Sequence, residues 1–371
     1  MRYYLIAGEA SGDLHGANLV RALSAKDPDA VFRGFGGDAM HEAGVDIVTH
    51  YKETAYMGFV EVFMHLRKIL NNIKSCKQDI TGWKPDVVIL IDYPGFNLRI
   101  APHVHEIGIK VFYYISPQLW AWKSSRVNII KQYVDRLFVI LPFEEAFYQK
   151  FNYPVSFVGH PLLDAIASNK GNEHFREQFQ LGDKQLIAVL PGSRKQEITV
   201  KLPVMLSMAK YYPEFVFVVA CAPGMDDSFY AGFEKRENII YISGSTYDIL
   251  RNAYAAMVTS GTATLETALF RVPQVVCYKG SVISYHIAKR LVKIKYISLV
   301  NLIADKQVVP ELIQHDFNHD SLRTHLDLLL KDAAYRNTML SEYDKLYTVL
   351  GGVGASARTA DEMMKLLAEG K

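Results

Sequence analysis

The sequence contains few cysteines and no long apolar run. Three of its 371 residues are cysteine, Cys76, Cys221 and Cys277, and none of them belongs to a Cys-x-x-Cys pair. This scattered distribution argues against a disulfide framework and against a zinc site built on paired thiolates. No stretch approaches the length of a membrane span, and Gly8 and Glu9 interrupt the N-terminal residues before a signal peptide could develop. We therefore expect a cytoplasmic protein, soluble or peripheral to a membrane.

An excess of charge of one sign is also missing. Lysine and arginine number 41 against 39 aspartate and glutamate, which gives a net charge of +2. A chain so nearly neutral has no global field that would attract nucleic acid, so we expect no nucleic-acid partner. Any anionic ligand must be met by a local group of residues.

The order of apolar runs predicts two α/β domains. Short β-branched and aromatic runs alternate with amphipathic segments, which is typical of parallel sheets covered by helices on both faces. The length and the 50% hydrophobic content suffice for two cores. The first set of predicted strands covers 3–7, 31–34, 87–91, 110–115, 136–140 and 155–158, and the second covers 186–190, 215–220, 239–242, 256–259 and 274–278. A polar stretch at 168–183 is the predicted connector, so we expect domains at 1–167 and 168–349 with a cleft between them.

Two turns of the second domain favour a nucleotide diphosphate site. Residues 190–194, Leu-Pro-Gly-Ser-Arg, follow a predicted strand and open a helix, and Arg194 suits an anion. Residues 258–266 give a strand, a Ser-Gly-Thr turn and a helix whose first amides could hold a diphosphate. Glu266, one turn into that helix, suits a ribose diol. The alternatives are an ordinary turn with a solvated Arg194, and a glutamate that only complements its own helix.

Other phosphate-binding motifs are missing. The pattern GxxxxGK[ST] is absent from the chain, which argues against a P-loop nucleotidase or kinase. The glycines of 34–37 differ in spacing from GxGxxG and follow a second strand, so a dinucleotide oxidoreductase gains little support. The predicted second domain has no Asp-x-Asp pair, through which many sugar transferases hold a metal ion. We therefore expect neither a metal nor another cofactor, with Arg194 and helix amides stabilising a leaving diphosphate.

The first domain offers two carboxylates in loops that follow strands. Glu9 lies in the loop of 7–13, whose glycines allow a close approach of backbone. Asp92 follows the apolar run 87–91 and should emerge at the carboxyl end of a buried strand, where it could take a proton from an attacking hydroxyl. The alternatives are a plain turn in which Asp13 caps a helix, and an Asp92 that only initiates its turn.

Eight blocks of residues together resemble one enzyme family, the lipid-A-disaccharide synthases. They are spread over roughly residues 3–315, and their ordered succession is far more specific than any single motif. The blocks are 8–13 (GEASGD), 56–62 (YMGFVEV), 91–97 (IDYPGFN), 116–122 (SPQLWAW), 190–194 (LPGSR), 260–266 (SGTATLE), 288–293 (AKRLVK) and 296–302 (YISLVNL).

The resemblance implies a fold, a reaction and a set of site residues. The fold is GT-B, two Rossmann-like domains facing across a cleft, in which a C-terminal helix at about 350–371, predicted at 357–367, returns to the first domain. The reaction transfers 2,3-diacylglucosamine from UDP to 2,3-diacylglucosamine 1-phosphate (lipid X) and gives a β(1→6) disaccharide 1-phosphate and UDP, a step of lipid A and lipopolysaccharide synthesis. The acidic residue that the family needs for catalysis falls on Asp92, and Glu9 matches a second family carboxylate. Where relatives can carry a further acidic residue, this chain has Gly95. The implied UDP-sugar contacts are Gly192, Ser193, Arg194, Ser260, Gly261, Thr262, Ala263, Thr264, Glu266 and Asn301.

Apolar and basic residues beside these motifs suggest a membrane-facing edge. A predicted helix at 59–73 has more large apolar residues than one buried face requires, and Arg67 and Lys68 lie among them. Burial on two sides explains this surplus equally well, and core packing explains the tryptophans. The expected location is the cytoplasmic face of the inner membrane, and a homodimer is one of the assemblies left open. The candidate acceptor or membrane residues are Met57, Phe59, Phe63, Met64, Trp120, Trp122, Lys289 and Arg290.

Two rival functions remain open at this point. A UDP-sugar epimerase or hydrolase would share the fold and the nucleotide site but would need no acylated acceptor or membrane edge. A UDP-sugar sensor without catalysis would keep Arg194 and Glu266 but would have no use for a carboxylate at Asp92.

Overall fold

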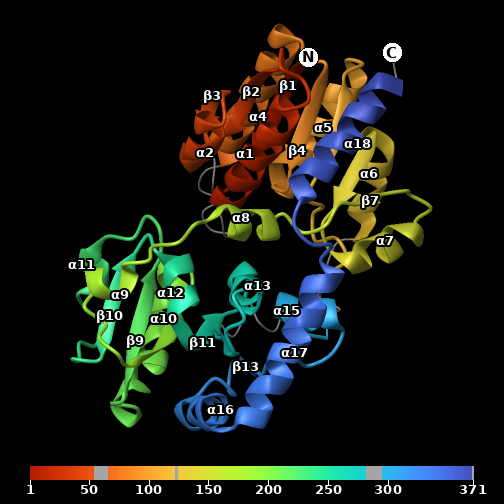
Figure 1. Ribbon diagram of the computed structural model, residues 1–371. Coiled ribbons are helices and arrows are strands. Elements are labelled where there is room, and N and C mark those ends of the chain that lie inside the picture. The colour runs from red at the N-terminus through yellow and green to blue at the C-terminus, as the bar shows by residue number, and fades with distance from the viewer. Residues whose placement is uncertain (54–65, 122–123, 281–294, 370–371) are drawn as a thin grey trace. The chain divides into compact units, whose positions relative to one another are not determined.

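A computed structural model describes residues 1–53, 66–121, 124–280 and 295–369 (Figure 1). The chain divides into two compact units. The first contains residues 1–168 and 350–371, and the second contains residues 169–349. Each unit is an α/β layer structure with its own parallel sheet.

The first unit is built on a seven-stranded parallel sheet of order β3-β2-β1-β4-β5-β6-β7. Its central strand β4 (Val-Val-Ile-Leu-Ile) is buried along its whole length, because helices cover both faces of the sheet. The strands are β1 (Arg2–Ala7), β2 (Val31–Gly36), β3 (Val45–His50), β4 (Val87–Ile91), β5 (Lys110–Tyr114), β6 (Arg136–Val139) and β7 (Ser156–Phe157).

Helices of the first unit form one layer on each face of its sheet. Alternate strand residues such as Tyr4, Ile6 and Leu90 pack with α4 to α7 in one continuous core. On the opposite face α1 lies beside α18 and α8 (Figure 1). The helices are α1 (Ala10–Ser24), α2 (Asp38–Glu42), η1 (Tyr51–Glu53), α4 (Leu66–Trp83), α5 (Pro94–Glu106), η2 (Ser124–Arg126), α6 (Val127–Tyr133), α7 (Pro142–Gln149), α8 (Leu162–Ser168) and α18 (Ala355–Glu369).

Helix α18 belongs to the first unit although it ends the chain. The Asp164 carboxylate accepts hydrogen bonds from the backbone N–H groups of Gly354 (2.5 Å) and Ser356 (2.8 Å), which satisfies donors at the start of this helix. Further along, the guanidinium of Arg136 on β6 lies 2.8 Å from Glu362. These contacts join α18 to α8 and to the sheet.

The second unit is built on a six-stranded parallel sheet of order β10-β9-β8-β11-β12-β13. The strands are β8 (Gln185–Leu190), β9 (Phe215–Cys221), β10 (Ile239–Ser243), β11 (Ala253–Thr259), β12 (Gln274–Tyr278) and β13 (Glu311–Ile313). The helices are α9 (Phe175–Gln178), α10 (Lys195–Leu206), η3 (Ala209–Tyr211), α11 (Asp227–Tyr230), α12 (Thr246–Asn252), α13 (Thr262–Leu269), α15 (Leu299–Ala304), α16 (His319–Lys331) and α17 (Ala333–Val349).

The α/β fold class predicted from the sequence is confirmed, and four local predictions need correction. The first sheet has the additional strand β3 and the second has β13. Helix α4 extends to Trp83 and does not end at Ile73. The predicted connector 168–183 contains the short helix α9, whose Phe175 is buried in the second core.

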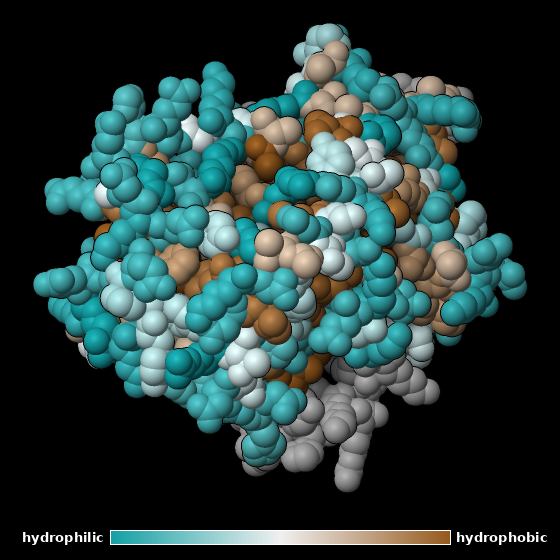
Figure 2. Space-filling view, turned by 60° about the horizontal axis from the view of Figure 1, so that its bottom comes forward, coloured by the Kyte–Doolittle hydropathy of each residue, from teal (hydrophilic) through white to brown (hydrophobic). Residues whose placement is uncertain are grey.

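No helix within the described residues is long and apolar enough to cross a bilayer. On the face drawn in Figure 2, hydrophilic residues predominate and hydrophobic ones occupy small areas between them. Exposed large apolar residues are distributed over several elements, with Leu70 on α4 among the most exposed at 51%.

Candidate active site

Both candidate carboxylates of the first unit lie at the same edge of its sheet. Strands β1 and β4 are paired neighbours, and Ala7 at the end of β1 is in register with Ile91 at the end of β4. Glu9 is the N-cap residue of α1, two residues beyond Ala7, and Asp92 directly follows Ile91. The loops after neighbouring parallel strands therefore bring these two acids together at the edge where α/β proteins bind ligands.

The turn that carries Asp92 has an unusual backbone. Asp92 and Tyr93 both adopt left-handed conformations, with φ of 44° and 46°. The buried amide of Asn97 holds this turn by donating to the carbonyl oxygens of Asp92 (2.8 Å) and Ile91 (3.2 Å). The Tyr113 hydroxyl donates to the Asp92 carbonyl at 2.5 Å. Such conformations persist only where their surroundings impose them, and they concentrate at functional sites.

Gly8 allows the two loops to pack against each other. A Cβ at position 8 would lie 2.3 Å from the ring of Tyr93, so only glycine permits this approach. The Tyr93 ring also stacks on Phe96, with centroids 5.4 Å apart. Asp13, predicted as a possible cap of its own helix, instead accepts hydrogen bonds from the backbone of Gly37 (2.7 Å) and Met40 (3.1 Å) at the start of α2.

The surroundings of Asp92 raise its proton affinity. Burial, together with the smaller effect of the negative charge of Glu9, raises the pKa of this half-buried carboxyl to about 7. A backbone hydrogen bond from Tyr93 acts against both effects. A carboxylate with a pKa near neutrality suits proton transfer at physiological pH, because it is ionised and still basic.

In the second unit, the two predicted anion loops also follow paired strands. Leu190 at the end of β8 is in register with Val258 near the end of β11. Helix α10 starts at Lys195 directly after Arg194, and α13 starts at Thr262 after Gly261, as predicted from the turns. The structure thus brings the loop of Gly192, Ser193 and Arg194 beside the helix N-terminus that contains Ser260, Gly261, Thr262, Ala263 and Thr264.

Glu266 is held by a tyrosine that the sequence did not single out. The Tyr247 hydroxyl on α12 donates to the Glu266 carboxylate at 3.3 Å. Burial raises the pKa of Glu266, and this hydrogen bond lowers it. The Tyr247 ring packs against Phe270 at a centroid distance of 5.1 Å. Glu266 is therefore positioned from the side of α12, one turn below the Ser-Gly-Thr loop.

Asn301, which the family resemblance predicted to contact the UDP-sugar, has a different environment from the one expected. It is fully buried, and its amide donates to Val309 (2.9 Å) and to Glu311 (2.8 Å). Its oxygen accepts hydrogen bonds from the backbone of Val308 and Val309. Because these bonds occupy its donors and acceptors inside the unit, we remove Asn301 from the proposed ligand contacts and assign it a supporting role.

Hydrogen bonds through Glu311 connect Asn301 to the Ser260 loop. The Glu311 carboxylate accepts hydrogen bonds from the backbone of Ile297 (3.0 Å) and Ser298 (2.9 Å). The Ser260 hydroxyl in turn donates to the carbonyl of Ile297 at 2.9 Å. Asn301, Glu311 and Ile297 thus form a chain of contacts that ends at a candidate diphosphate-binding residue.

One of the predicted acceptor or membrane residues can be placed. Trp120 is half-buried, and its ring contacts Phe143 edge to face at 4.9 Å, which fits core packing in part. The other predicted positions lie outside the described residues; they are Met57, Phe59, Phe63, Met64, Trp122, Lys289 and Arg290.

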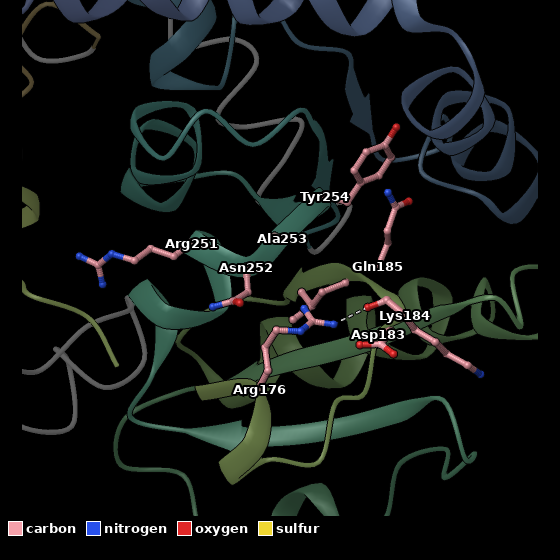
Figure 3. Close-up of a pocket in the computed structure, with 9 residues that line it drawn as sticks. Arg176, Asp183, Lys184, Gln185, Arg251, Asn252, Ala253 and Tyr254 are labelled. Carbon is pink, nitrogen blue, oxygen red and sulfur yellow. Dashed lines mark hydrogen bonds between the residues drawn. The ribbon is translucent and has the colours of Figure 1, made fainter. Parts of the chain in front are cut away.

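An open pocket of about 310 Å³ in the second unit lies away from these loops. It is at the amino ends of β8 and β11, where Gln185 and Ala253 begin their strands (Figure 3). Arg176 donates there to the carbonyl oxygens of Gly182 (2.7 Å) and Lys184 (2.6 Å). The side chain of Arg251 points away from this group and pairs with Asp248 at 3.2 Å (Figure 3). Because the arginines of this pocket bind carbonyl and carboxylate oxygens of the protein itself, we do not place the substrate there.

The described residues contain no group of three or more acidic, histidine or cysteine side chains arranged to hold a metal ion. An Asp-x-Asp pair does occur in the first unit, at Asp27 and Asp29. The Asp27 carboxylate, however, accepts hydrogen bonds from the N-terminal ammonium (2.8 Å) and the Tyr3 hydroxyl (3.1 Å) near the amino end of β1. It lies at the sheet edge opposite Asp92.

Comparison with known proteins identifies the family. A model of the lipid-A-disaccharide synthetase family matches residues 3–362. The chain belongs to the lipid-A-disaccharide synthase family. Curated relatives named lipid-A-disaccharide synthase include one from Syntrophus aciditrophicus, 42% identical with 98% of this chain and 97% of the relative covered. Another, from Geobacter sulfurreducens, is 39% identical with 99% and 97% covered. The chain is thus an enzyme, a glycosyltransferase, as its motifs predicted.

Solved structures that resemble this synthase show its fold. A putative UDP-N-acetylglucosamine 2-epimerase from Listeria monocytogenes matches with a TM-score of 0.70 at 14% identity, covering 99% of this chain and 97% of that one. The calicheamicin glycosyltransferase CalG4 matches with a TM-score of 0.65 at 16% identity, covering 99% and 98%. The GT-B fold with two Rossmann-like domains is confirmed. At such low identity the likeness to epimerases concerns the fold alone, and the family match does not favour the epimerase or hydrolase alternative.

Several site residues escaped the sequence reasoning. Asn97, Tyr113, Tyr247 and Glu311 act through tertiary hydrogen bonds that no local pattern announces. The role of Lys201, in contrast, could have been inferred from the spacing of charged residues. Arg194, Glu197 and Lys201 are spaced three and four residues apart, which places them on one face at the start of α10.

Proposed function

We propose that this synthase transfers 2,3-diacylglucosamine from UDP to the 6-hydroxyl of 2,3-diacylglucosamine 1-phosphate. The family match supports the reaction class, and the environment of Asp92 is the observation that carries the mechanism. Its carboxyl lies at the carboxyl end of a buried strand, has a pKa raised to about 7 and is held in a turn of two left-handed residues. A non-catalytic sensor would have no use for this arrangement.

The proposed reaction is a single displacement. The acceptor oxygen bonds to C1 of the donor sugar while the bond from C1 to the UDP oxygen breaks, and the electron pair of that bond leaves with UDP. The hydroxyl proton passes to Asp92, which acts as the general base. Attack from the face opposite the departing UDP gives the β linkage.

The second unit supplies the proposed donor site. Arg194 and the N-terminal amides of α13 would bind the diphosphate, whose charge increases as the C1 bond breaks. Glu266 would accept hydrogen bonds from the ribose hydroxyls. All three features lie at the ends of the paired strands β8 and β11.

The reaction can be tested directly. Purified protein is incubated with both lipid substrates, the disaccharide 1-phosphate is sought by mass spectrometry, and UDP release is measured with and without acceptor. We expect disaccharide, and UDP release that depends on acceptor. UDP release at the same rate from donor alone would identify a hydrolase, and UDP binding without any product would identify a sensor.

The pH dependence of catalysis should report the Asp92–Glu9 pair. Asp92 must be ionised to accept a proton, so kcat/KM should rise with pH and level off above about pH 7, the pKa of the free enzyme's base. Glu9→Gln removes a negative charge that disfavours ionisation of Asp92. The acid limb of the profile should therefore move to lower pH in this variant.

A matched control for that experiment is Glu106→Gln, which removes an exposed acid at the end of α5 on the opposite sheet edge. Its pH profile should coincide with that of the wild type. A Glu9→Gln profile with an unmoved acid limb would contradict the proposed coupling between the two carboxyls.

We also propose peripheral association with the cytoplasmic face of the inner membrane. The substrates carry acyl chains, so an edge that meets the bilayer would give access to them. Among the described residues, Leu70 on α4 is 51% exposed, and the exposed Arg67 and Lys68 precede it. An apolar residue beside basic ones suits an anionic membrane surface.

Phe63→Ser combined with Met64→Ser should weaken sedimentation with vesicles of anionic phospholipid. An apolar side chain contributes roughly 1.5 to 3 kcal/mol when it leaves water, so replacing two that enter the bilayer should reduce binding about a hundredfold or more. Ile107→Ser is the control, because Ile107 is 40% exposed at the far end of α5. Unchanged sedimentation of a folded double variant would place these two residues in the protein core.

A further inference from the structure

A buried lysine lies beneath the proposed diphosphate loops. The Lys201 side chain on α10 is 3% exposed, and its ammonium donates a hydrogen bond to the Thr259 hydroxyl at the end of β11. Lysine is almost never so deeply buried unless it is paired. Thr259 immediately precedes Ser260, so this bond joins α10 to the start of the Ser-Gly-Thr loop.

The partner of this lysine is also the partner of Arg194. The Lys201 ammonium lies 3.6 Å from one carboxylate oxygen of Glu197, and the guanidinium of Arg194 lies 3.5 Å from the other. The two cations differ in exposure, because the side chain of Arg194 is 62% exposed. One carboxylate is thus shared by a buried cation and by the arginine assigned to the donor.

The loop itself is fitted around Glu197. Gly192 has φ of 117°, and a Cβ there would lie 2.5 Å from the Glu197 carboxylate oxygen. Burial lowers the pKa of Lys201, and the charge of Glu197 opposes that shift. The ion pair therefore keeps a positive charge within the unit at a position directly below the loop backbone.

This arrangement addresses a problem of charge. A donor diphosphate would attract Arg194 away from Glu197, and without another cation that carboxylate would stay uncompensated next to the incoming phosphates. A carboxylate and a phosphate that lie side by side repel each other strongly where water is partly excluded. We propose that Lys201 is a positioning residue that neutralises Glu197, so that Arg194 can exchange this carboxylate for the diphosphate of a UDP-sugar. The inference rests on the proposed donor site of the second unit.

The test is a double-variant cycle with UDP as the probe, measured by calorimetry on the full chain. Lys201→Met leaves the Glu197 carboxylate uncompensated beside the diphosphate and should therefore weaken UDP binding about tenfold. Adding Glu197→Gln to Lys201→Met removes the uncompensated charge and should restore UDP affinity to within about threefold of wild type. A merely structural role for Lys201 would not be repaired by a second substitution.

Two further variants make the cycle decisive. Lys210→Met removes an exposed lysine of η3, which follows the far end of α10, and should leave UDP affinity unchanged. If Lys201→Met does not fold, Glu197→Gln alone decides, because the proposal expects its UDP affinity to equal or exceed that of wild type. A clear loss of affinity in Glu197→Gln would overturn the proposal, as would unchanged binding by Lys201→Met or failed restoration in the double variant. A wild-type protein that does not bind UDP would instead refute the donor site itself.

Discussion

Asp92→Asn is expected to lower turnover by about 10²- to 10⁴-fold, the usual contribution of a general base. The amide has nearly the same shape as the carboxyl but cannot accept the proton of the acceptor hydroxyl. The proposed donor site lies on the other unit, so UDP affinity should stay within about twofold of wild type. Steady-state rates at saturating substrates, together with calorimetry for UDP, measure both quantities.

The same substitution should stabilise the protein at alkaline pH. The folded-state pKa of Asp92 is about 7, above the ordinary value of a carboxyl, so the folded state binds this proton more tightly than the unfolded state. The stabilisation is complete at pH values below the unfolded pKa and is lost as pH rises through 7. Above that pH the ionised, half-buried carboxylate destabilises the first unit, and asparagine removes that effect.

Thermal unfolding at two pH values checks this expectation. At pH 8.5 the Asp92→Asn protein should be more stable than wild type by about 1 to 3 kcal/mol, and at pH 5 the difference should shrink. Asparagine also tolerates the left-handed backbone at this position. A variant that is inactive and less stable at pH 8.5 would point to damage of the turn, and near-normal turnover would refute Asp92 as the base and make Glu9 the next candidate.

The central strands could be predicted from the sequence because burial on both faces produces continuous apolar runs. Strand β4 was predicted with its observed limits, 87–91. The two missed strands are edge strands of their sheets. Strand β3 (Val-Asp-Ile-Val-Thr-His) has polar residues among its apolar ones, and β13 has only three residues, so neither forms a recognisable run.

The loop positions of the site were equally predictable, because the ends of parallel strands define one edge. What escaped prediction depends on burial of polar groups. Asn97 and Lys201 look like ordinary helix residues in the sequence, yet both are buried and form hydrogen bonds beneath a loop of the candidate site. Asn301 shows the reverse case, since a family motif suggested ligand contact and the structure gives its amide internal partners. Only tertiary contacts distinguish these roles.

Arg194→Ala is expected to weaken UDP binding by about 1.5 to 3 kcal/mol, the range for a hydrogen bond to a charged group. The melting temperature should hardly change, because the arginine side chain is 62% exposed and exposed ion pairs such as the one with Glu197 contribute little to stability. Arg236→Ala is the matched control: Arg236 is 44% exposed and paired with Glu234, but it precedes β10 at the opposite edge of the same sheet. Its UDP affinity, measured by the same calorimetry, should equal that of wild type. Since both variants lose one exposed, paired arginine from one unit, a specific loss in Arg194→Ala would assign the diphosphate to the β8 loop, and equal affinities in the two variants would remove it from there.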